Sequence, residues 1–276
     1  MPYAENEGTK IYWDERGAGQ PLLLIMGLGS TSDLWYRLLP TLSAHYRTIL
    51  FDNRGVGRSD APPGPYSIRT MASDAAVVMD AAGVGSAHVL GFSMGGFIAQ
   101  ELALDYPEKV RTLILAGTAC GGKEAVRAAP EVLVALEARG VKTPEEGFWM
   151  IAPYIYDPST LPTRIEEDLA ASLRTSLQRR SYVAQLQGIV SWAGSHSRLN
   201  KIDAPVLIIH GESDQLIPPE NGRILAHVIA NAKVVMIPRA GHRFMTDQPE
   251  AASKAVLSFL DNAGVQTRWG VVAKMR

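Results

Sequence analysis

A short apolar run that leads into a serine flanked by glycines is the first feature of this sequence with chemical potential. The run reads HVLGFSMGGFIAQELALDYPEKV from His88, and Gly91 to Gly95 matches the pattern G-x-S-x-G. In that pattern the serine lies on a strained turn between a strand and a helix, and larger residues two positions away would crowd the turn. The sequence therefore predicts that Ser93 is a nucleophile.

A serine hydroxyl attacks well only when a base takes its proton, so a histidine is required. The chain has six histidines. His88 begins the strand that carries Ser93 and lies at its far end, and His210 ends another apolar run, where packing is the expected role. His242 lies in IPRAGHRF, a loop after the last apolar run, where an imidazole could reach the serine. We predict that His242 is the base, with His196 as the alternative.

The base in turn needs an acid that fixes its tautomer and stabilises the imidazolium. The segment HGESDQLIP follows the penultimate apolar run and offers two candidates, Glu212 and Asp214. The loop GTACGG, which follows the preceding apolar run, contains no acidic residue. The acid is therefore expected after the penultimate strand, and the order along the chain is serine, acid, histidine.

Acyl transfer also needs hydrogen-bond donors for the oxyanion that develops in the transition state. The backbone N–H of Met94 follows the serine and opens a helix, whose dipole favours negative charge. The second donor is expected from the loop IMGLGS, with the N–H of Leu28 as the candidate. A dinucleotide-binding interpretation of this loop fails because the third glycine of G-x-G-x-x-G is missing.

Apolar runs that lack polar alternation are typical of parallel strands buried on both faces. They are PLLLIMG from Pro21, RTILFDNRG from Arg47, HVLGFS from His88, RTLILAGTA from Arg111, PVLIIHGESD from Pro205 and KVVMIPRAGH from Lys233. Helical patterns lie between them, at residues 32–44, 68–82, 95–106 and 219–230. TKIYWDER is expected to form an antiparallel edge. This alternation predicts an α/β fold with a mainly parallel central sheet flanked by helices.

The alternation stops after Cys120, and residues 121–197 show helical patterns only. A helical block between two strands of a sheet indicates a cap over the carboxyl edge, where open α/β sheets bind ligands. We therefore expect a core formed by residues 1–120 and 198–276 and a cap, or lid, formed by residues 121–197. The tail from Val265 fits neither a helical nor a strand pattern.

Composition narrows the functional classes. The chain has 276 residues, of which 46% are hydrophobic and 20% charged, and its net charge of −1 does not favour nucleic acid as a partner. It has one cysteine and no HExxH, Cys/His cluster or P-loop, so no metal and no cofactor are expected. No signal-peptide pattern and no apolar run of membrane-spanning length are visible, so we expect a cytoplasmic protein without a membrane partner.

With these residues in place, the chain resembles the α/β-hydrolase superfamily, and most closely its small bacterial esterases, enol-lactonases and cofactor-free perhydrolases. The resemblance rests on IMGLGS, DNRGVGRSD, GFSMGG, APVLIIHGESDQLIPPENG and IPRAGH. It implies that Ser93, Asp214 and His242 are catalytic, and so favours Asp214 over Glu212. It also implies an oxyanion hole at Leu28 and Met94 and a helical lid. Most relatives have His-Gly where this chain has Met26-Gly27. The serine disfavours the dehalogenase and epoxide-hydrolase chemistry of aspartate nucleophiles.

Apolar residues beside the predicted catalytic groups suggest a pocket for small or medium apolar substrates. The predicted substrate-binding residues are Met26, Phe92, Trp149, Tyr154, Trp192, Leu216 and Phe244. The charges of residues 121–197 are mixed, without a cluster of arginines that would demand an anionic substrate. The expected activity is hydrolysis of carboxylic esters through an acyl-enzyme. A lactonase, a perhydrolase and a slow-turnover ligand receptor of the same fold are the alternatives. The expected partner is a small-molecule ester or lactone, and the sequence is compatible with a homo-oligomer.

Overall fold

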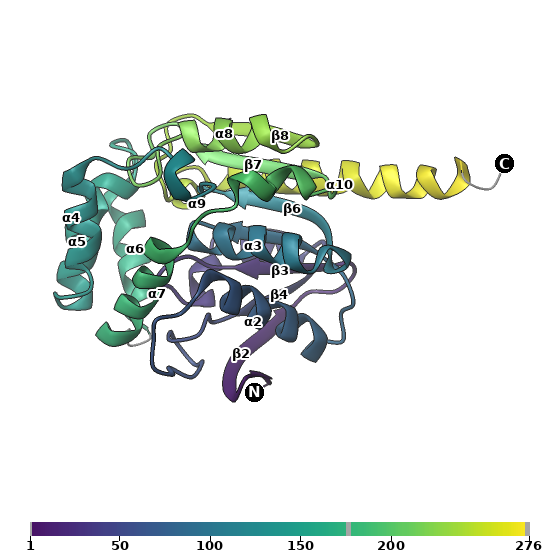
Figure 1. Ribbon diagram of the computed structural model, residues 1–276. Helices are drawn as coiled ribbons and strands as arrows, with labels where there is room; N and C mark the ends of the chain where they lie inside the picture. The colour runs from purple at the N-terminus through teal and green to yellow at the C-terminus, as the bar shows by residue number, and fades with distance from the viewer. Residues whose placement is uncertain (1, 175–177, 274–276) are drawn as a thin grey trace.

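A computed structural model describes residues 2–174 and 178–273, and its central element is an eight-stranded sheet (Figure 1). The strand order is β1-β2-β4-β3-β5-β6-β7-β8; β1 and β2 are antiparallel to their neighbours, and the remaining pairs are parallel. The strands are β1 (Tyr3–Asn6), β2 (Thr9–Arg16), β3 (Pro21–Ile25), β4 (Arg47–Phe51), β5 (Ala87–Phe92), β6 (Val110–Ala116), β7 (Val206–Gly211) and β8 (Ala232–Ile237). The predicted α/β architecture with a mainly parallel sheet is confirmed.

Both faces of the sheet are covered, which explains why its strands are apolar throughout. In β3, Leu23 and Ile25 belong to one buried cluster, while Leu22 and Leu24 belong to another on the opposite face. The first cluster includes residues of α2 (Ile68–Ala81), α3 (Met94–Asp105) and α8 (Glu220–Val228). The second includes residues of α10 (Pro249–Ala273) and of the segment around α1 (Leu39–Ser43).

Residues 121–197, which we call the helical insertion, connect β6 to β7. Their described residues contain η3 (Gly122–Glu124), α4 (Pro130–Ala138), α5 (Pro144–Ile155), α6 (Pro162–Ser172) and α7 (Arg179–Ser191), and no strand. These helices gather at one end of the sheet, and η4 (His196–Lys201) leads back to β7 (Figure 1). Thr143 and Glu146 form a reciprocal capping box at the start of α5, which satisfies two backbone donors there.

Two segments differ from the expectation. Residues 32–44 form η1 (Ser32–Trp35) and the short α1 instead of one helix. Pro40 has no backbone N–H, and inside a longer helix its ring would clash with the Tyr36 carbonyl. The first turn of a helix tolerates proline, so a new helix begins at Leu39. The chain after His242 forms α9 (Phe244–Asp247) and then α10, which continues to Ala273 and includes the described part of the unassigned tail. No helix in the described ranges is long and apolar enough to span a membrane.

The loop DNRGVGRSD after β4 is fastened from within and to its neighbours. Asp52 is fully buried and accepts hydrogen bonds from the Arg58 N–H at 3.0 Å and the Arg58 Nε at 2.7 Å. Arg54 pairs with Asp74 of α2 through two contacts of 2.6 Å. A Cβ at Gly57 would lie 2.3 Å from the Asp52 carboxylate. The charged residues of this loop therefore stabilise the fold.

Candidate active site

Ser93 lies on a sharp turn between β5 and α3, with φ 57° and ψ −121°. This left-handed region is unfavourable for a residue with a side chain, so surrounding contacts must hold the turn. A Cβ at Gly91 would lie 2.2 Å from the Gly95 carbonyl oxygen, and a Cβ at Gly95 would lie 2.1 Å from the Ile25 carbonyl oxygen. Both glycines are therefore needed for α3 to approach the strands, and the turn places Ser93 at the carboxyl end of β5.

The structure brings Ser93, His242 and Asp214 together in one hydrogen-bonded series. His242 Nε2 lies 3.0 Å from Ser93 Oγ, and His242 Nδ1 lies 2.8 Å from Asp214 Oδ2. In this geometry Nε2 can accept the serine proton while Asp214 holds the Nδ1–H. His196 begins η4 and forms no hydrogen bond with Ser93 in the described part of the chain, and Glu212 is exposed to solvent.

Both carboxylate oxygens of the buried Asp214 have partners. Oδ1 accepts the N–H groups of Leu216 at 3.0 Å and Ile217 at 2.8 Å, and His210 Nε2 lies 3.2 Å from Oδ2. Burial raises the pKa of Asp214, but the charge of His242 and hydrogen bonds from both histidines outweigh it and hold the pKa below its ordinary value. Asp214 is therefore ionised at neutral pH.

The loop after β3 lies against Ser93. A Cβ at Gly27 would lie 3.0 Å from Ser93 Cβ and 3.4 Å from its Oγ. Within the described ranges the Leu28 N–H donates to no protein acceptor, and the Met94 N–H, the first in α3, has no acceptor inside the helix. Two backbone donors therefore remain available beside Ser93, as stabilisation of an oxyanion requires.

Two further carboxylates hold the loops that carry the acid and the histidine. Asp247 Oδ2 accepts the N–H of Gly241, the residue before the histidine, at 2.7 Å. Asp157 Oδ2 accepts the hydroxyl of Ser213, the residue before the acid, at 2.7 Å. The Asp157 N–H also donates to Asp247 Oδ2 at 3.3 Å. The helical insertion, through Asp157, is thereby connected to both loops.

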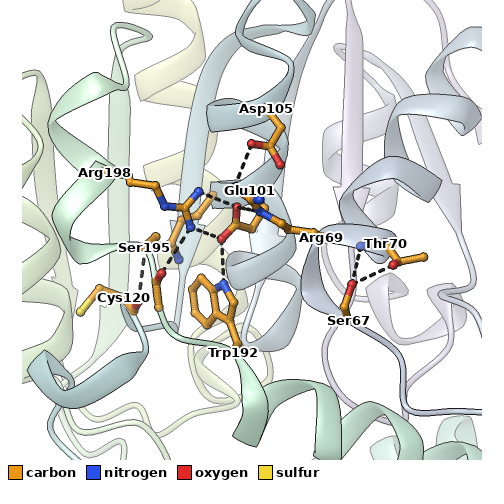
Figure 2. A network of polar contacts seen from close by, with 11 residues as sticks. Ser67, Arg69, Thr70, Glu101, Asp105, Cys120, Trp192, Ser195 and Arg198 are labelled. Atoms are coloured by element: carbon orange, nitrogen blue, oxygen red, sulfur yellow. Dashed lines mark hydrogen bonds and ion pairs between the residues drawn. The ribbon is translucent and has the colours of Figure 1, made fainter.

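The helix that begins after Ser93, α3, is anchored at its middle by the buried Glu101. Figure 2 shows that its carboxylate receives Trp192 Nε1 at 2.7 Å and both terminal nitrogens of Arg198. Arg69 of α2 contributes a second cation, at 3.3 Å. Trp192 and Arg198 belong to the segment that returns from the insertion to β7, so this network ties that segment to α3.

A cavity of about 230 Å³ opens above the turn at Ser93, between the sheet edge and the helical insertion. Its floor includes Ser93 and His242, and its walls include residues of α4, α5 and α7. The aliphatic and aromatic lining consists of Leu28, Phe92, Met94, Phe97, Ala119, Ala125, Val126, Ala128, Leu133, Leu136, Ile151, Ile155, Ile189, Leu216 and Ile217. A mainly apolar cavity over Ser93 suits a small molecule with an apolar part.

Two of the residues predicted to bind substrate, Phe92 and Leu216, line this cavity. The other five predicted residues are not among the described residues that line this cavity: Met26, Trp149, Tyr154, Trp192 and Phe244.

Each of these five residues has a physical reason for its place. Met26 and Phe244 are buried in the cluster shared by the sheet and α10. Trp149 is 45% exposed on α5, and Tyr154 packs among the helices of the insertion. Trp192 serves the carboxylate network of α3 described above. Sequence position relative to a catalytic residue did not indicate which way these side chains point.

Three arginines of the cavity lining were missed by the sequence analysis: Arg127, Arg139 and Arg243. Arg139 belongs to the insertion and Arg243 to the loop that carries His242, more than a hundred residues later. Burial lowers the pKa of Arg139, and the positive charge of Arg243 lowers it further. The cationic cluster arises only when the insertion folds over the core, so no local pattern could reveal it.

Comparison with known proteins places this site in a family. A family model described as alpha/beta hydrolase fold matches residues 20–144, and one described as TAP-like protein matches residues 190–270. The poly(3-hydroxyalkanoate) depolymerase of Ectopseudomonas oleovorans is 35% identical, over 87% of this chain and 84% of that protein.

Two solved structures have the same fold along nearly their whole length. The enol-lactonase from Burkholderia xenovorans LB400 superposes with a TM-score of 0.83 at 26% identity, covering 94% of this chain and 100% of that one. A thermophilic esterase from Thermogutta terrifontis gives a TM-score of 0.84 at 26% identity, covering 95% and 98%. These findings agree with the resemblance seen in the sequence motifs, and the chain belongs to the alpha/beta hydrolase fold family.

Proposed function

We propose that this protein is a serine hydrolase that cleaves carboxylic esters of small to medium size through an acyl-enzyme. The observation that carries the proposal is the series Ser93–His242–Asp214, with contacts of 3.0 Å and 2.8 Å, beneath a mainly apolar cavity. The proposal assigns the roles of nucleophile, base and orienting acid to these three residues in that order.

The proposed reaction has two halves. His242 takes the proton of Ser93 as Oγ attacks the ester carbonyl, and the N–H groups of Leu28 and Met94 receive the oxyanion. The imidazolium then protonates the leaving alcohol, and the acyl group remains on the serine. Water repeats the sequence with His242 as base and releases the acid. Asp214, ionised at neutral pH, stabilises the imidazolium in both halves.

In this proposal the helical insertion acts as a cap. Residues of α4, α5 and α7 form the walls of the cavity over Ser93, and they are apolar where they face it. Excluding water from the substrate strengthens the hydrogen bonds to the oxyanion. The substrate is therefore expected to be an ester with an apolar portion under these helices.

A lactone is an internal ester, so the same residues would open it by the same steps. The esterase and the enol-lactonase among the structural neighbours support both substrate types for this fold at comparable similarity. The proposal therefore covers linear esters and lactones. In a lactone both product halves stay in one molecule, so the alcohol leaves only with the acid.

Hydrolysis of p-nitrophenyl esters, from acetyl to dodecanoyl, tests the proposal. The wild-type protein should turn over the shorter or middle members, and the optimal chain length measures the cavity. Ser93→Ala should lose at least about a thousandfold in kcat, whereas Ser258→Ala, on the exposed face of α10, serves as the matched control. Wild-type inactivity across these esters and a parallel lactone series, or a fully active Ser93→Ala protein, contradicts the proposal.

A further inference from the structure

Two guanidinium groups face the cavity and are held there by aromatic rings. The guanidinium carbon of Arg243 lies 5.8 Å from the centroid of the Phe92 ring, and that of Arg139 lies 5.6 Å from the centroid of the Tyr182 ring. Tyr182 is itself fixed, because its hydroxyl donates to the Leu136 carbonyl at 2.8 Å. Both arginines line the same cavity as the nucleophile. The rings orient these cations without neutralising their charge.

Neither cation has an anionic partner in the described part of the chain. The arginines that form ion pairs there are Arg16, Arg37, Arg47, Arg54, Arg58, Arg69, Arg198 and Arg223. The contrast with Arg54 is informative, because Arg54 is 6% exposed and is paired with Asp74, while Arg243 is 7% exposed and is unpaired. The lining of the cavity includes no aspartate or glutamate among its described residues.

Such an arrangement costs stability unless something else compensates for it. A guanidinium taken out of water without a carboxylate loses hydration, and two of them near each other add repulsion. Proteins generally break such local rules at functional sites, where a ligand supplies the missing interaction. The remaining lining is mainly apolar, so an anionic group that enters the cavity would find these arginines as its strongest partners.

We propose that Arg139 and Arg243 form a carboxylate-binding subsite, so that the preferred substrate is an ester or lactone that carries a free carboxylate elsewhere in the same molecule. This inference rests on the proposed function. Arg243 directly follows His242 and lies over the ring of Phe92, the residue before Ser93. In the proposed substrate, a short chain of atoms therefore separates the carboxylate from the carbonyl that Ser93 attacks. Arg139 belongs to the insertion and lines the same cavity.

The test compares acids with amides of the same shape. The first pair is the methyl half-ester of adipic acid and the primary amide made from it. In this pair the free carboxylate of the acid lies on the acyl side of the ester. The second pair is the acetate ester of ω-hydroxycaproic acid and the primary amide made from it. In this pair the free carboxylate of the acid lies on the alcohol side of the ester. The measured quantity is the ratio of kcat/KM for the acid to kcat/KM for the amide. The wild-type ratio should exceed about ten in at least one pair.

Removal of either guanidinium should abolish most of this preference. Arg243→Gln and Arg139→Gln should each lower the ratio by roughly tenfold to a hundredfold, because a charge-assisted hydrogen bond is lost. Arg243→Lys should retain part of the preference, since it keeps the charge but not the bidentate geometry. Arg223→Gln is the matched control, because it removes one positive charge from the exposed surface of α8. A wild-type ratio near one in both pairs, unchanged ratios in the Gln variants, or an equal drop in Arg223→Gln would overturn the inference.

Binding without turnover separates this inference from the proposed function. Titration calorimetry on Ser93→Ala protein should show binding of the acid of the preferred pair and at least roughly tenfold weaker binding of its amide. That difference should disappear when Arg243→Gln is added to Ser93→Ala. If wild-type protein hydrolyses acid and amide equally, the subsite is refuted and the esterase stands. If no ester is hydrolysed but the acid still binds in an Arg243-dependent way, the subsite stands and the esterase fails.

Discussion

The carboxylate of Asp247 accepts the backbone N–H of Gly241 at 2.7 Å, one residue before the catalytic histidine of the proposed mechanism. Asp247 is 6% exposed, and its other oxygen accepts the hydroxyl of Thr160 in the insertion at 2.5 Å. Burial raises the pKa of Asp247 to about 6 in spite of these hydrogen bonds. The group that holds the histidine loop therefore titrates just below neutral pH.

Asp247→Asn should make the protein relatively more stable as pH rises. The folded pKa of about 6 lies above the ordinary value of 3.8, so the folded protein binds the proton more tightly than the unfolded chain between these values. Wild-type stability from this group therefore falls as pH rises through that window, by at most about 3 kcal/mol. Asparagine keeps an oxygen for Gly241 and offers an N–H to Thr160.

Chemical denaturation at pH 4.5 and pH 7, roughly spanning this window, measures the effect. The variant minus wild-type difference in unfolding free energy should become more favourable to Asp247→Asn at the higher pH. Asp203→Asn, in the exposed segment before β7, should show no such trend. A difference that is independent of pH would contradict the assigned direction of the pKa.

Removal of the predicted base should abolish turnover, and removal of the alternative base should not. His242→Gln is expected to lower kcat by at least about a thousandfold, because no other group in contact with Ser93 Oγ can take its proton. His196→Gln should stay within about twofold of wild type. Steady-state hydrolysis of one p-nitrophenyl ester decides between them, and the reverse ranking would transfer the role of base to His196.

The position of the oxyanion loop can be tested through a glycine, since backbone N–H groups cannot be deleted by substitution. A methyl group at Gly27 would lie 3.0 Å from Ser93 Cβ, so Gly27→Ala must displace the loop or the serine by a few tenths of an ångström. We expect kcat/KM to fall roughly tenfold to a hundredfold with little loss of thermal stability. At Gly85 an added Cβ meets nothing within 4 Å, so Gly85→Ala is the control. Equal activity of the two variants would remove the loop from the mechanism.

The network of Figure 2 should contribute to stability in a pH-dependent way. Burial raises the pKa of Glu101, but hydrogen bonds from Arg198, Trp192 and Arg69 and the charge of Arg198 bring it below the ordinary value. Glu101→Gln should therefore cost about 1–3 kcal/mol at neutral pH, a range that allows for the partial solvent exposure of the arginines.

Because the folded pKa of Glu101 is depressed, its contribution is present above the ordinary glutamate value and is lost as pH falls through the folded pKa. The stability gap between wild type and Glu101→Gln should thus narrow in acid. Urea denaturation at neutral pH and at successively lower pH values measures this gap, with Glu108→Gln, at an exposed position, as the control. A gap that widens in acid would contradict the assigned shift.

The sequence predicted those parts of the molecule that depend on local rules. Strands buried on both faces must be apolar, so β3 to β7 were visible, and the glycines around Ser93 indicated the turn that their close contacts now explain. Asp214 and His242 were predictable because loops at the carboxyl ends of parallel strands converge on one edge. The division into a core and a cap at residues 121–197 stays a prediction.

What the sequence did not predict depends on long-range packing. Trp149 and Trp192 are aromatic residues of the insertion, but their orientation depends on how each helix rotates against its neighbours. Arg139 and Arg243 line one cavity only because the insertion lies over the core. Helix α10 was missed because the sequence analysis found no clear pattern in the tail, although the backbone continues as one helix to Ala273.

The most direct test of the central claim is covalent labelling of the nucleophile. Wild-type protein treated with a fluorophosphonate should lose its esterase activity in proportion to the incorporation of one label per chain. Mass spectrometry of the digest should place that label on Ser93, and Ser93→Ala protein should remain unlabelled. Loss of activity with the label on another residue, or full activity in protein labelled on Ser93, would contradict the acyl-enzyme mechanism.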